Sequence, residues 1–235
     1  MNTFSFKSEN LDLPLCVTCG QVFRWTQDVD GRWLGVDGRH WYRVALGTEL
    51  KVESNAMAED FHRLFRMDLD MAEVGKRIAA KAPELEPYIA RFEGLRIMRP
   101  NDPNEVFFSF LCSANNNLAR IGPMVRFLGS LGESIKSSPF AVCAFPEASI
   151  IAETQEELLR QNGFGYRGKT IPETARALLS NGRGWLHSLA AGSYDDAWQE
   201  LVKLPNIGRK LADCIALYGL GKMEAAPVDT HLWQA

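Results

Sequence analysis

Near its N-terminus the chain alternates apolar and polar positions in short runs. The segments GQVFRW (20–25), RWLGV (32–36) and WYRVAL (41–46) are rich in aromatic and β-branched residues, and DVDG and VDGR separate them. Asp-Gly pairs favour the tight turns of β-hairpins. This pattern predicts an antiparallel meander.

Further along, apolar residues recur at three-to-four spacing, which is typical of helices. This spacing predicts helices between residues 56 and 98, with apolar positions at Phe61, Leu64, Phe65, Val74 and Ile78. After residue 100 the pattern is helical almost throughout.

Three local signals mark helix starts in the second half. Pro103 suits a first helical turn, and the pairs Thr154/Glu157 and Ser193/Asp196 have the spacing of capping boxes. We therefore expect helices to begin close to each of these signals.

Together the patterns predict an α+β fold. Residues 1–100 should form an N-terminal antiparallel sheet domain with flanking helices, and residues 101–235 an all-helical domain. With 235 residues, 46% of them hydrophobic, the chain can bury a proper core. No apolar run approaches the roughly 20 residues that cross a bilayer, and residues 1–15 lack an export signal. We therefore expect an intracellular protein without a membrane partner.

Composition adds two constraints on chemistry. The five cysteines are scattered and odd in number, which suits a reducing compartment: Cys16, Cys19, Cys112, Cys143 and Cys214. Only Cys16 and Cys19 have metal-like spacing, and no second pair follows, so we predict no metal site. The net charge of -3 gives no global sign of nucleic-acid binding, so any basic surface must be local.

The stretch LPNIGRKLADCIALYGL predicts a helix-hairpin-helix at about 193–220, in which Gly208 allows the bend. Its small core should comprise Leu204, Ile207, Leu211 and Ala212. The N–H groups at the start of the second helix attract phosphate. Alone, such a hairpin indicates non-specific contact with a nucleic-acid backbone.

Lys210 lies in the first turn of that second helix. Arg209 and the positive end of the helix dipole both disfavour its ammonium form, whereas an amine must be neutral to attack. From a reference pKa of about 10.4, deprotonation at pH 7 costs roughly 4.6 kcal/mol, so a reactive lysine needs such a setting. The alternative is a solvated lysine. Asp213, three residues on, is either its salt-bridge partner or solvated.

Asp229, in APVDTH, is placed as the N-cap of a further helix. Capping alone would contribute about 1 kcal/mol. A carboxylate fixed at a helix start is also ionised and immobile, which suits it to stabilise a developing cation or relay a proton. The two roles are compatible.

LPNIGRKLADC followed by PVDTH resembles the hairpin and aspartate signature of DNA base-excision glycosylases. GQVFRW, FSFLCSANNNLARI and GFGYRGK extend the resemblance over nearly the whole chain, and within that superfamily it is most similar to the 8-oxoguanine DNA glycosylases. The resemblance implies that Lys210 attacks C1′ of a flipped nucleotide, forms a Schiff base and cuts the strand by β-elimination, while Asp229 stabilises the cationic sugar. It implies double-stranded DNA containing 8-oxoguanine as partner, a monomer, and no cofactor apart from a structural monovalent cation at the hairpin.

Two residues would recognise the damaged base. The backbone carbonyl of Gly20 would accept the N7 hydrogen that 8-oxoguanine has and guanine lacks. Cys214 would press on one face of the base. The alternatives are a strand bulge at Gly20 and a small buried hydrophobic residue at Cys214.

The resemblance also assigns residues to the duplex. Asn115 would fill the gap left by the extruded base, Arg120 and Arg167 would donate to the orphaned cytosine, and Tyr166 would wedge into the stack. Without the resemblance, the three asparagines indicate only a turn and a cap. His231 would contact a phosphate or cap a helix, and Gly208 would lie close to the DNA backbone.

The chain departs from the family at its end, because members continue past the aspartate through at least one more helix. Since the sequence stops at Ala235, we expect that helix to be missing and excision to be impaired. Two rival functions remain: a non-catalytic DNA-binding module, and a glycosylase for other oxidised bases. Lys210 with Asp229 argues against the first, and Gly20 with the paired arginines against the second.

Overall fold

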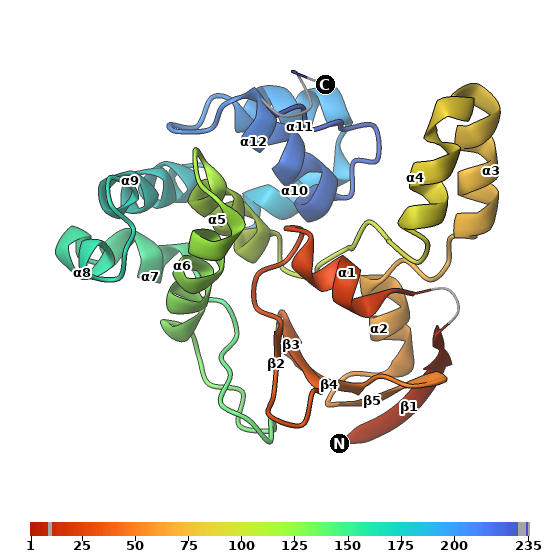
Figure 1. Cartoon of the computed structure of the whole chain (residues 1–235). Helices are drawn as coiled ribbons and strands as arrows, with labels where there is room; N and C mark the ends of the chain where they lie inside the picture. The colour runs from red at the N-terminus through yellow and green to blue at the C-terminus, as the bar shows by residue number, and fades with distance from the viewer. Residues whose placement is uncertain (9–10, 230–233, 235) are drawn as a thin grey trace. The chain divides into compact units, whose positions relative to one another are not determined.

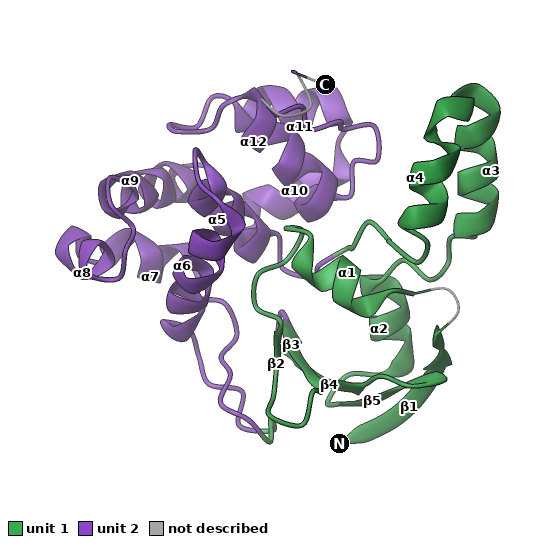
Figure 2. Ribbon diagram, viewed as in Figure 1, with its two compact units in different colours: residues 1–36, 40–99, 137–139 green, residues 37–39, 100–136, 140–235 purple. Residues whose placement is uncertain are grey.

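The computed structural model describes residues 1–8, 11–229 and 234 (Figure 1). Contacts between residues divide the chain into two compact units (Figure 2). Unit 1 comprises residues 1–36, 40–99 and 137–139, and unit 2 comprises residues 37–39, 100–136 and 140–235. The proposed domain boundary at residue 100 stays a prediction.

A five-stranded antiparallel sheet with the order β1-β5-β4-β3-β2 forms the centre of the N-terminal half. Its strands are β1 (Asn2–Lys7), β2 (Thr26–Gln27), β3 (Trp33–Asp37), β4 (His40–Ala45) and β5 (Glu49–Ser54). The prediction of a meander is confirmed for RWLGV and WYRVAL. It is wrong for GQVFRW, which is irregular and gives way to a strand only at Thr26.

The outer strand β1 was not predicted from the sequence. It pairs with β5, so that Phe4 lies opposite Val52 and Phe6 opposite Leu50. Helices α1 (Leu13–Thr18) and α2 (Ala58–Leu64) cover one face of the sheet (Figure 1). The core between these layers contains Leu13, Cys16, Trp25, Tyr42, Val44, Leu50, Val52, Phe61, Leu64 and Phe65.

Aromatic rings dominate this core. The Phe61 ring stacks on Phe6 with centroids 5.2 Å apart, and Trp25 stacks on Tyr42 at 5.9 Å. The helical spacing of Phe61, Leu64 and Phe65 therefore predicted core residues correctly. Such rings bury large apolar areas and prefer offset or edge contacts, which fixes how α2 lies on the sheet.

Helices α3 (Met71–Lys81) and α4 (Glu86–Arg91), joined by a 3-10 turn at Pro83–Leu85, form a separate hairpin in unit 1. Helix formation here agrees with the prediction. The apolar positions of α3 are not in the sheet core, however, and Ile78 is 40% exposed.

Unit 2 is helical and is built around α5 (Pro103–Ser113), in which eight of eleven residues are buried. A helix that is apolar on all sides needs partners on all sides. The other elements are α6 (Leu118–Ser130), α7 (Ala148–Glu153), α8 (Glu156–Gln161), α9 (Arg167–Ser180), α10 (Trp185–Ala191), α11 (Tyr194–Leu201), α12 (Arg209–Cys214) and the π-helix η3 (Ile215–Gly219).

Two of the three predicted helix starts are confirmed. Pro103 is the first residue of α5, and the Ser193 side chain accepts a hydrogen bond from the Asp196 N–H at 3.1 Å. The capping box at Thr154 is wrong. Thr154 is instead the C-cap of α7, where its hydroxyl donates to the Ile150 carbonyl at 2.8 Å, and α8 begins after Gln155.

Among the described residues, no helix combines the length and the apolar character that a bilayer span requires. The same part of the chain contains no group of three or more His, Cys, Asp or Glu side chains placed to hold a metal ion.

Candidate functional site

The helix-hairpin-helix consists of α11, a turn at residues 202–208, and α12. Its four predicted core residues are all buried, between 0 and 7% exposed: Leu204, Ile207, Leu211 and Ala212. The turn contacts the Thr174 hydroxyl of α9, which accepts from Asn206 Nδ2 at 3.0 Å and shares its one hydrogen between the carbonyls of Thr170 at 2.9 Å and Pro205 at 3.1 Å. The buried Thr174 therefore fixes the hairpin turn on α9.

Gly208 does not make the bend. Its φ of -91° is ordinary, whereas Asn206 has the left-handed φ of 65°. Asn adopts this region more readily than most residues because its short polar side chain bonds locally. Gly208 is instead the N-cap of α12, and a Cβ built there would meet no atom of the described residues within 4 Å. Its missing side chain thus leaves the start of α12 open.

Lys210 is half-buried in the first turn of α12, beside an aromatic pair. Its Nζ lies 5.8 Å from the centroid of the Phe110 ring, and Phe110 stacks on Tyr218 with centroids 5.4 Å apart. Tyr218 comes from the π-helix η3 and Phe110 from α5. The sequence prediction missed both rings, since nothing in FFSFLC or IALYG distinguishes them from core residues.

Lys210 and Asp229 both lie close enough to Cys214 to interact with it electrostatically. Burial is the main cause that raises the pKa of the Cys214 thiol; the charge and a hydrogen bond of Lys210 lower it, and the charges of Asp213 and Asp229 raise it. Cys214 is 3% exposed, while Asp229 is exposed. The structure therefore brings an amine, a thiol and a carboxylate together at α12.

Asp213 forms a hydrogen bond with Tyr194, a contact that the sequence did not indicate. It accepts a hydrogen bond from the Tyr194 hydroxyl, with the two oxygens 2.6 Å apart. This bond is the main cause that raises the pKa of Tyr194 to about 12. Because Tyr194 opens α11, the bond ties the start of α11 to α12.

A second cluster lies where α5 turns into α6 and α9 begins. Arg167 Nη2 donates to the carbonyls of Ala114 and Asn115, the latter at 3.0 Å. The Tyr166 hydroxyl also donates to the Ala114 carbonyl, at 3.2 Å, and the Arg167 guanidinium lies 4.6 Å from the centroid of the Tyr166 ring. Three predicted duplex residues, Asn115, Tyr166 and Arg167, are therefore neighbours.

These neighbours differ in exposure. Arg167 is 4% exposed, and its Nε finds no hydrogen-bond partner among the described residues. Asn115, with a left-handed φ of 49°, is exposed, and Tyr166 is 52% exposed. Arg120 is also exposed, and its Nη2 donates to the Gly163 carbonyl at 3.4 Å. In this conformation Arg167 stabilises the Asn115 turn, while Arg120 and Tyr166 face solvent.

Gly20 belongs to unit 1 and follows α1, with a left-handed φ of 96° that favours glycine. The next residue, Gln21, is buried: its Nε2 donates to the Arg96 carbonyl at 2.9 Å and its Oε1 accepts from the Met98 N–H at 2.9 Å. The side chain of Gln21 thus fixes the peptide that follows Gly20. Since this segment is not a strand, the alternative of a strand bulge is wrong.

Residues 3–107 match the family described as "8-oxoguanine DNA glycosylase, N-terminal domain". The N-glycosylase/DNA lyase OGG1 of Arabidopsis thaliana is 35% identical over 241 residues, covering 95% of this chain and 65% of that protein. A crystal structure of the Clostridium acetobutylicum 8-oxoguanine glycosylase/lyase with duplex DNA covers 94% of this chain and 77% of that one, with a TM-score of 0.83 and 28% identity. In sequence and in fold the chain is therefore similar to 8-oxoguanine DNA glycosylases over nearly its whole length.

Further glycosylases are also similar to the chain. The DNA-free form of the Clostridium acetobutylicum enzyme covers all of this chain and 83% of that one, with a TM-score of 0.86 and 27% identity. The N-glycosylase/DNA lyase of Saccharomyces cerevisiae is 30% identical over 190 residues, covering 76% of this chain and 50% of that protein. The chain thus spans 65% and 50% of the lengths of these two curated relatives.

One candidate residue, His231, lies outside the described residues. The other candidates divide between the units: Gly20 belongs to unit 1, and Asn115, Arg120, Tyr166, Arg167, Gly208, Lys210, Cys214 and Asp229 belong to unit 2.

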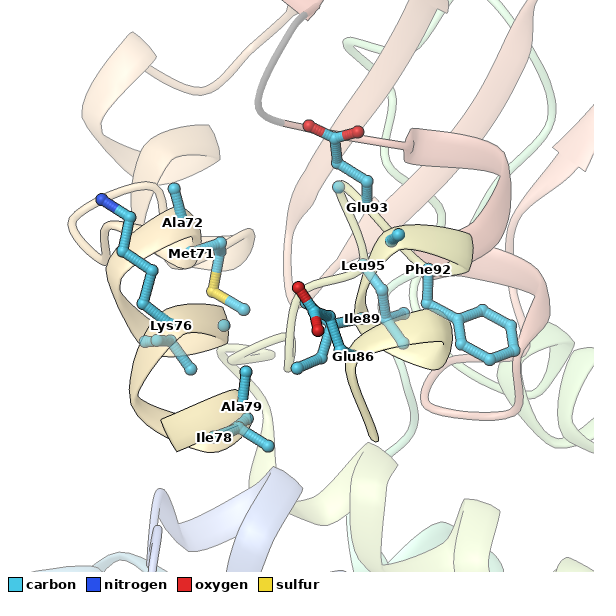
Figure 3. Close-up of a pocket in the computed structure, with 14 residues that line it drawn as sticks. Met71, Ala72, Lys76, Ile78, Ala79, Glu86, Ile89, Phe92, Glu93 and Leu95 are labelled. Carbon is cyan, nitrogen blue, oxygen red and sulfur yellow. The ribbon is translucent and has the colours of Figure 1, made fainter. Parts of the chain in front are cut away.

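A cavity of about 520 Å³ lies between α3 and α4 (Figure 3). Met71, Ile78 and Ile89 give it an apolar lining, and Glu86 adds a carboxylate. All its lining residues fall within 71–95, so none of the candidate residues reaches it. We assign the cavity no part in the chemistry.

Proposed function

We propose that the protein is a DNA glycosylase with lyase activity that removes 8-oxoguanine from duplex DNA, acting inside the cell. The observation that carries the proposal is that Lys210 and Asp229 both lie near Cys214 of α12, in a chain similar to 8-oxoguanine glycosylases. A covalent lyase-type glycosylase needs a half-buried amine and a carboxylate in one site.

Lys210 is the nucleophile. Its neutral Nζ forms a bond to C1′ of the flipped nucleotide while the bond from C1′ to the base breaks, and the base departs with the bonding electrons and takes up a proton. The aminal then opens to an imine, which acidifies the C2′ hydrogen. Loss of that proton expels the 3′ phosphate and cuts the strand. No cofactor enters, because the reacting groups are side chains.

Asp229 stabilises the positive charge that grows on the sugar as the base leaves. A fixed carboxylate suits this task because its charge is in place before the reaction starts. Phe110 and Tyr218 form an apolar wall near the amine, which limits water at the reacting centre and strengthens the electrostatic attraction there.

We further propose how the base and its partner are recognised. The Gly20 carbonyl accepts the N7 hydrogen of 8-oxoguanine, and Cys214 packs against the base. Asn115 occupies the space that the base leaves, Tyr166 wedges into the stack, and Arg120 and Arg167 donate to the orphaned cytosine. The clustering of Asn115, Tyr166 and Arg167 supports this assignment. Arg167 would first release the Ala114 and Asn115 carbonyls.

Gly208→Ala is expected to leave the melting temperature nearly unchanged but to weaken duplex binding about threefold to tenfold. A methyl group there meets no atom in the described part of the chain, so the fold loses only the small difference between Gly and Ala at an N-cap, below about 1 kcal/mol. It does obstruct a phosphate that approaches the start of α12. Fluorescence anisotropy with undamaged duplex, beside a thermal melt, makes the comparison. An unchanged affinity would show that the duplex does not approach this N-cap.

Arg120→Ala is expected to reduce the preference for 8-oxoguanine opposite cytosine over adenine about tenfold, because charged contacts to a base edge contribute roughly 1–3 kcal/mol each. Single-turnover excision rates with the four opposite bases measure the preference. Arg126→Ala, on the same helix, serves as control and should keep it. Equal rates opposite all four bases in the unaltered protein would contradict the assignment.

The proposed function is tested by borohydride trapping on duplexes that carry 8-oxoguanine opposite each of the four bases. A covalent adduct with 8-oxoguanine duplex and none with undamaged duplex is expected, strongest opposite cytosine. Trapping with an oxidised pyrimidine instead would favour a different substrate. Duplex binding without any adduct would favour a non-catalytic DNA-binding protein.

We also propose that the protein acts as a monomer and that the hairpin turn binds one monovalent cation through backbone carbonyls. The resemblance of LPNIG to the family's hairpin supports the cation. Duplex affinity in potassium chloride should exceed that in tetramethylammonium chloride at equal ionic strength, and sedimentation should give the mass of one chain. Equal affinity in the two salts would contradict the proposed cation site.

A further inference from the structure

The loop that carries Asp229 is held at its beginning by one side chain. The loop runs from residue 221 to 229, after the π-helix η3. Lys222 Nζ donates to the carbonyls of Ala190 at 2.7 Å and Gly192 at 2.5 Å, both at the C-terminal end of α10. The ammonium group of Lys222 thus ties the loop to the end of a helix that is distant in sequence.

The end of α10 is a favourable place for this ammonium group. The last carbonyls of a helix have no partner within the helix and carry the negative end of its dipole. A lysine ammonium has three donors, and here two of them are used on two carbonyls. Since Lys222 is half-buried, these bonds are less screened by water than those of an exposed lysine.

The backbone of Lys222 strengthens the attachment. Its N–H donates to the Ala216 carbonyl at 2.9 Å, and its carbonyl accepts from the Ala225 N–H at 3.1 Å. Four hydrogen bonds of the loop therefore use atoms of this one residue. The loop is held from Lys222 to Ala225, and Ala225 is itself 7% exposed.

Only a short, stiff segment separates this attachment from the carboxylate. Three residues, Ala226 to Val228, lie between Ala225 and Asp229. Pro227 fixes its own φ and restricts the residue before it to extended conformations. A shift of the attachment would therefore move Asp229 by a similar amount, because the intervening chain has few torsions that could absorb the shift.

We propose that Lys222 is a positioning residue that holds the Asp229 carboxylate near Cys214, on the helix that also carries Lys210, by tying its loop to the C-terminal end of α10. The catalytic consequence of this placement rests on the proposed function, whereas the attachment itself does not. Lys222 does not touch the reacting atoms, so it acts on the rate only through Asp229. A misplacement of about 1 Å can cost up to about a hundredfold in rate.

Lys222→Met keeps the length of the side chain and removes its donors. It is expected to lower the single-turnover excision rate about tenfold and to leave duplex affinity within about twofold. Lys222→Arg, which can still donate to both carbonyls, should restore most of the rate. Lys81→Met, at the exposed C-terminal end of α3 in unit 1, is the matched control and should match the unaltered protein.

A double-mutant cycle separates positioning from general damage. If Lys222 acts through Asp229, then adding Lys222→Met to Asp229→Asn should lower excision no further, because the carboxylate that it positions is already gone. Losses that multiply in the double variant would overturn the positioning role, as would an unchanged rate in Lys222→Met alone.

Hydrogen exchange gives a readout that does not need activity. Lys222→Met should speed exchange of the Ala225 amide and its neighbours in residues 223–229, while amides of α12 keep their protection. Unchanged exchange in the loop would overturn the attachment whether or not the protein excises 8-oxoguanine. Faster loop exchange, combined with no excision or trapping by the unaltered protein, would instead overturn the proposed function and leave the attachment in place.

Discussion

Lys210→Gln is expected to abolish borohydride trapping and strand cutting while duplex affinity stays within about twofold. Glutamine has a similar length but no nucleophilic nitrogen, so neither the bond to C1′ nor the imine can form. The hairpin contacts that would bind the phosphate backbone use other groups, namely the N–H groups at the start of α12. Gel detection of the covalent adduct and of the cut strand, beside anisotropy, measures all three quantities.

The control for this variant is Lys136→Gln. Lys136 is an exposed lysine of unit 2 to which we give no role, and its replacement should leave the amount of adduct unchanged. Undiminished trapping in Lys210→Gln would show that another amine is the nucleophile. It would contradict the role that the proposed function gives to Lys210.

Asp229→Asn is expected to lower the single-turnover excision rate by about 10²–10³, the loss typical when one preorganised charge or donor is removed from a transition state. The variant keeps the shape of the side chain and removes its charge. Duplex affinity should remain within about twofold, because the carboxylate is not expected to attract DNA. The rate at saturating protein and the affinity are measured separately.

Glu224→Gln is the matched control for Asp229→Asn. Glu224 is an exposed carboxylate of the same loop, so the substitution makes the same change in net charge a few residues away. It should leave the rate within about twofold. Equal losses in the two variants would show that only the overall charge of the loop matters and that Asp229 has no special place.

Local patterns in the sequence predicted the elements that depend mainly on interactions between residues close in sequence. Aromatic alternation around Asp-Gly turns predicted β3 and β4, and the spacing of Phe61, Leu64 and Phe65 predicted a buried helix face. The strand β1 was missed because only Phe4 and Phe6 alternate in it, and its partner β5 follows more than forty residues later. Pairing at that separation depends on the assembled core.

The irregular course of GQVFRW has the same origin. Its residues would suit a strand, but the Gln21 side chain bonds to the backbone at Arg96 and Met98, some seventy-five residues away. Those bonds satisfy buried backbone groups that the hydrogen bonds of a β-sheet would otherwise satisfy. The bonds of Gln21 to distant backbone groups therefore outweigh the local preference of this segment for a strand. The sequence alone does not show that they do.

The candidate site was easier to predict than the surroundings of its members. Lys210, Cys214 and Asp229 lie in short recognisable motifs, and the structure brings them together. The left-handed turn at Asn206 and the aromatic pair beside Lys210 depend on contacts with α9 and α5, which no motif encodes. Arg167 illustrates the same limit, because its motif does not show that the guanidinium bonds to backbone carbonyls.

The π-helix after α12 makes the number of residues in that turn matter as much as their identity. A π-turn holds one residue more than an α-turn, and Tyr218 meets Phe110 from within it. In a chain one residue shorter at this turn, a regular α-helix would continue, and the following side chains would rotate by about 100° around the axis. A gap at residues 215–219 in an alignment would thus mark homologues in which the Phe110 ring near the lysine has a different aromatic partner or none, even where the other aligned residues are identical.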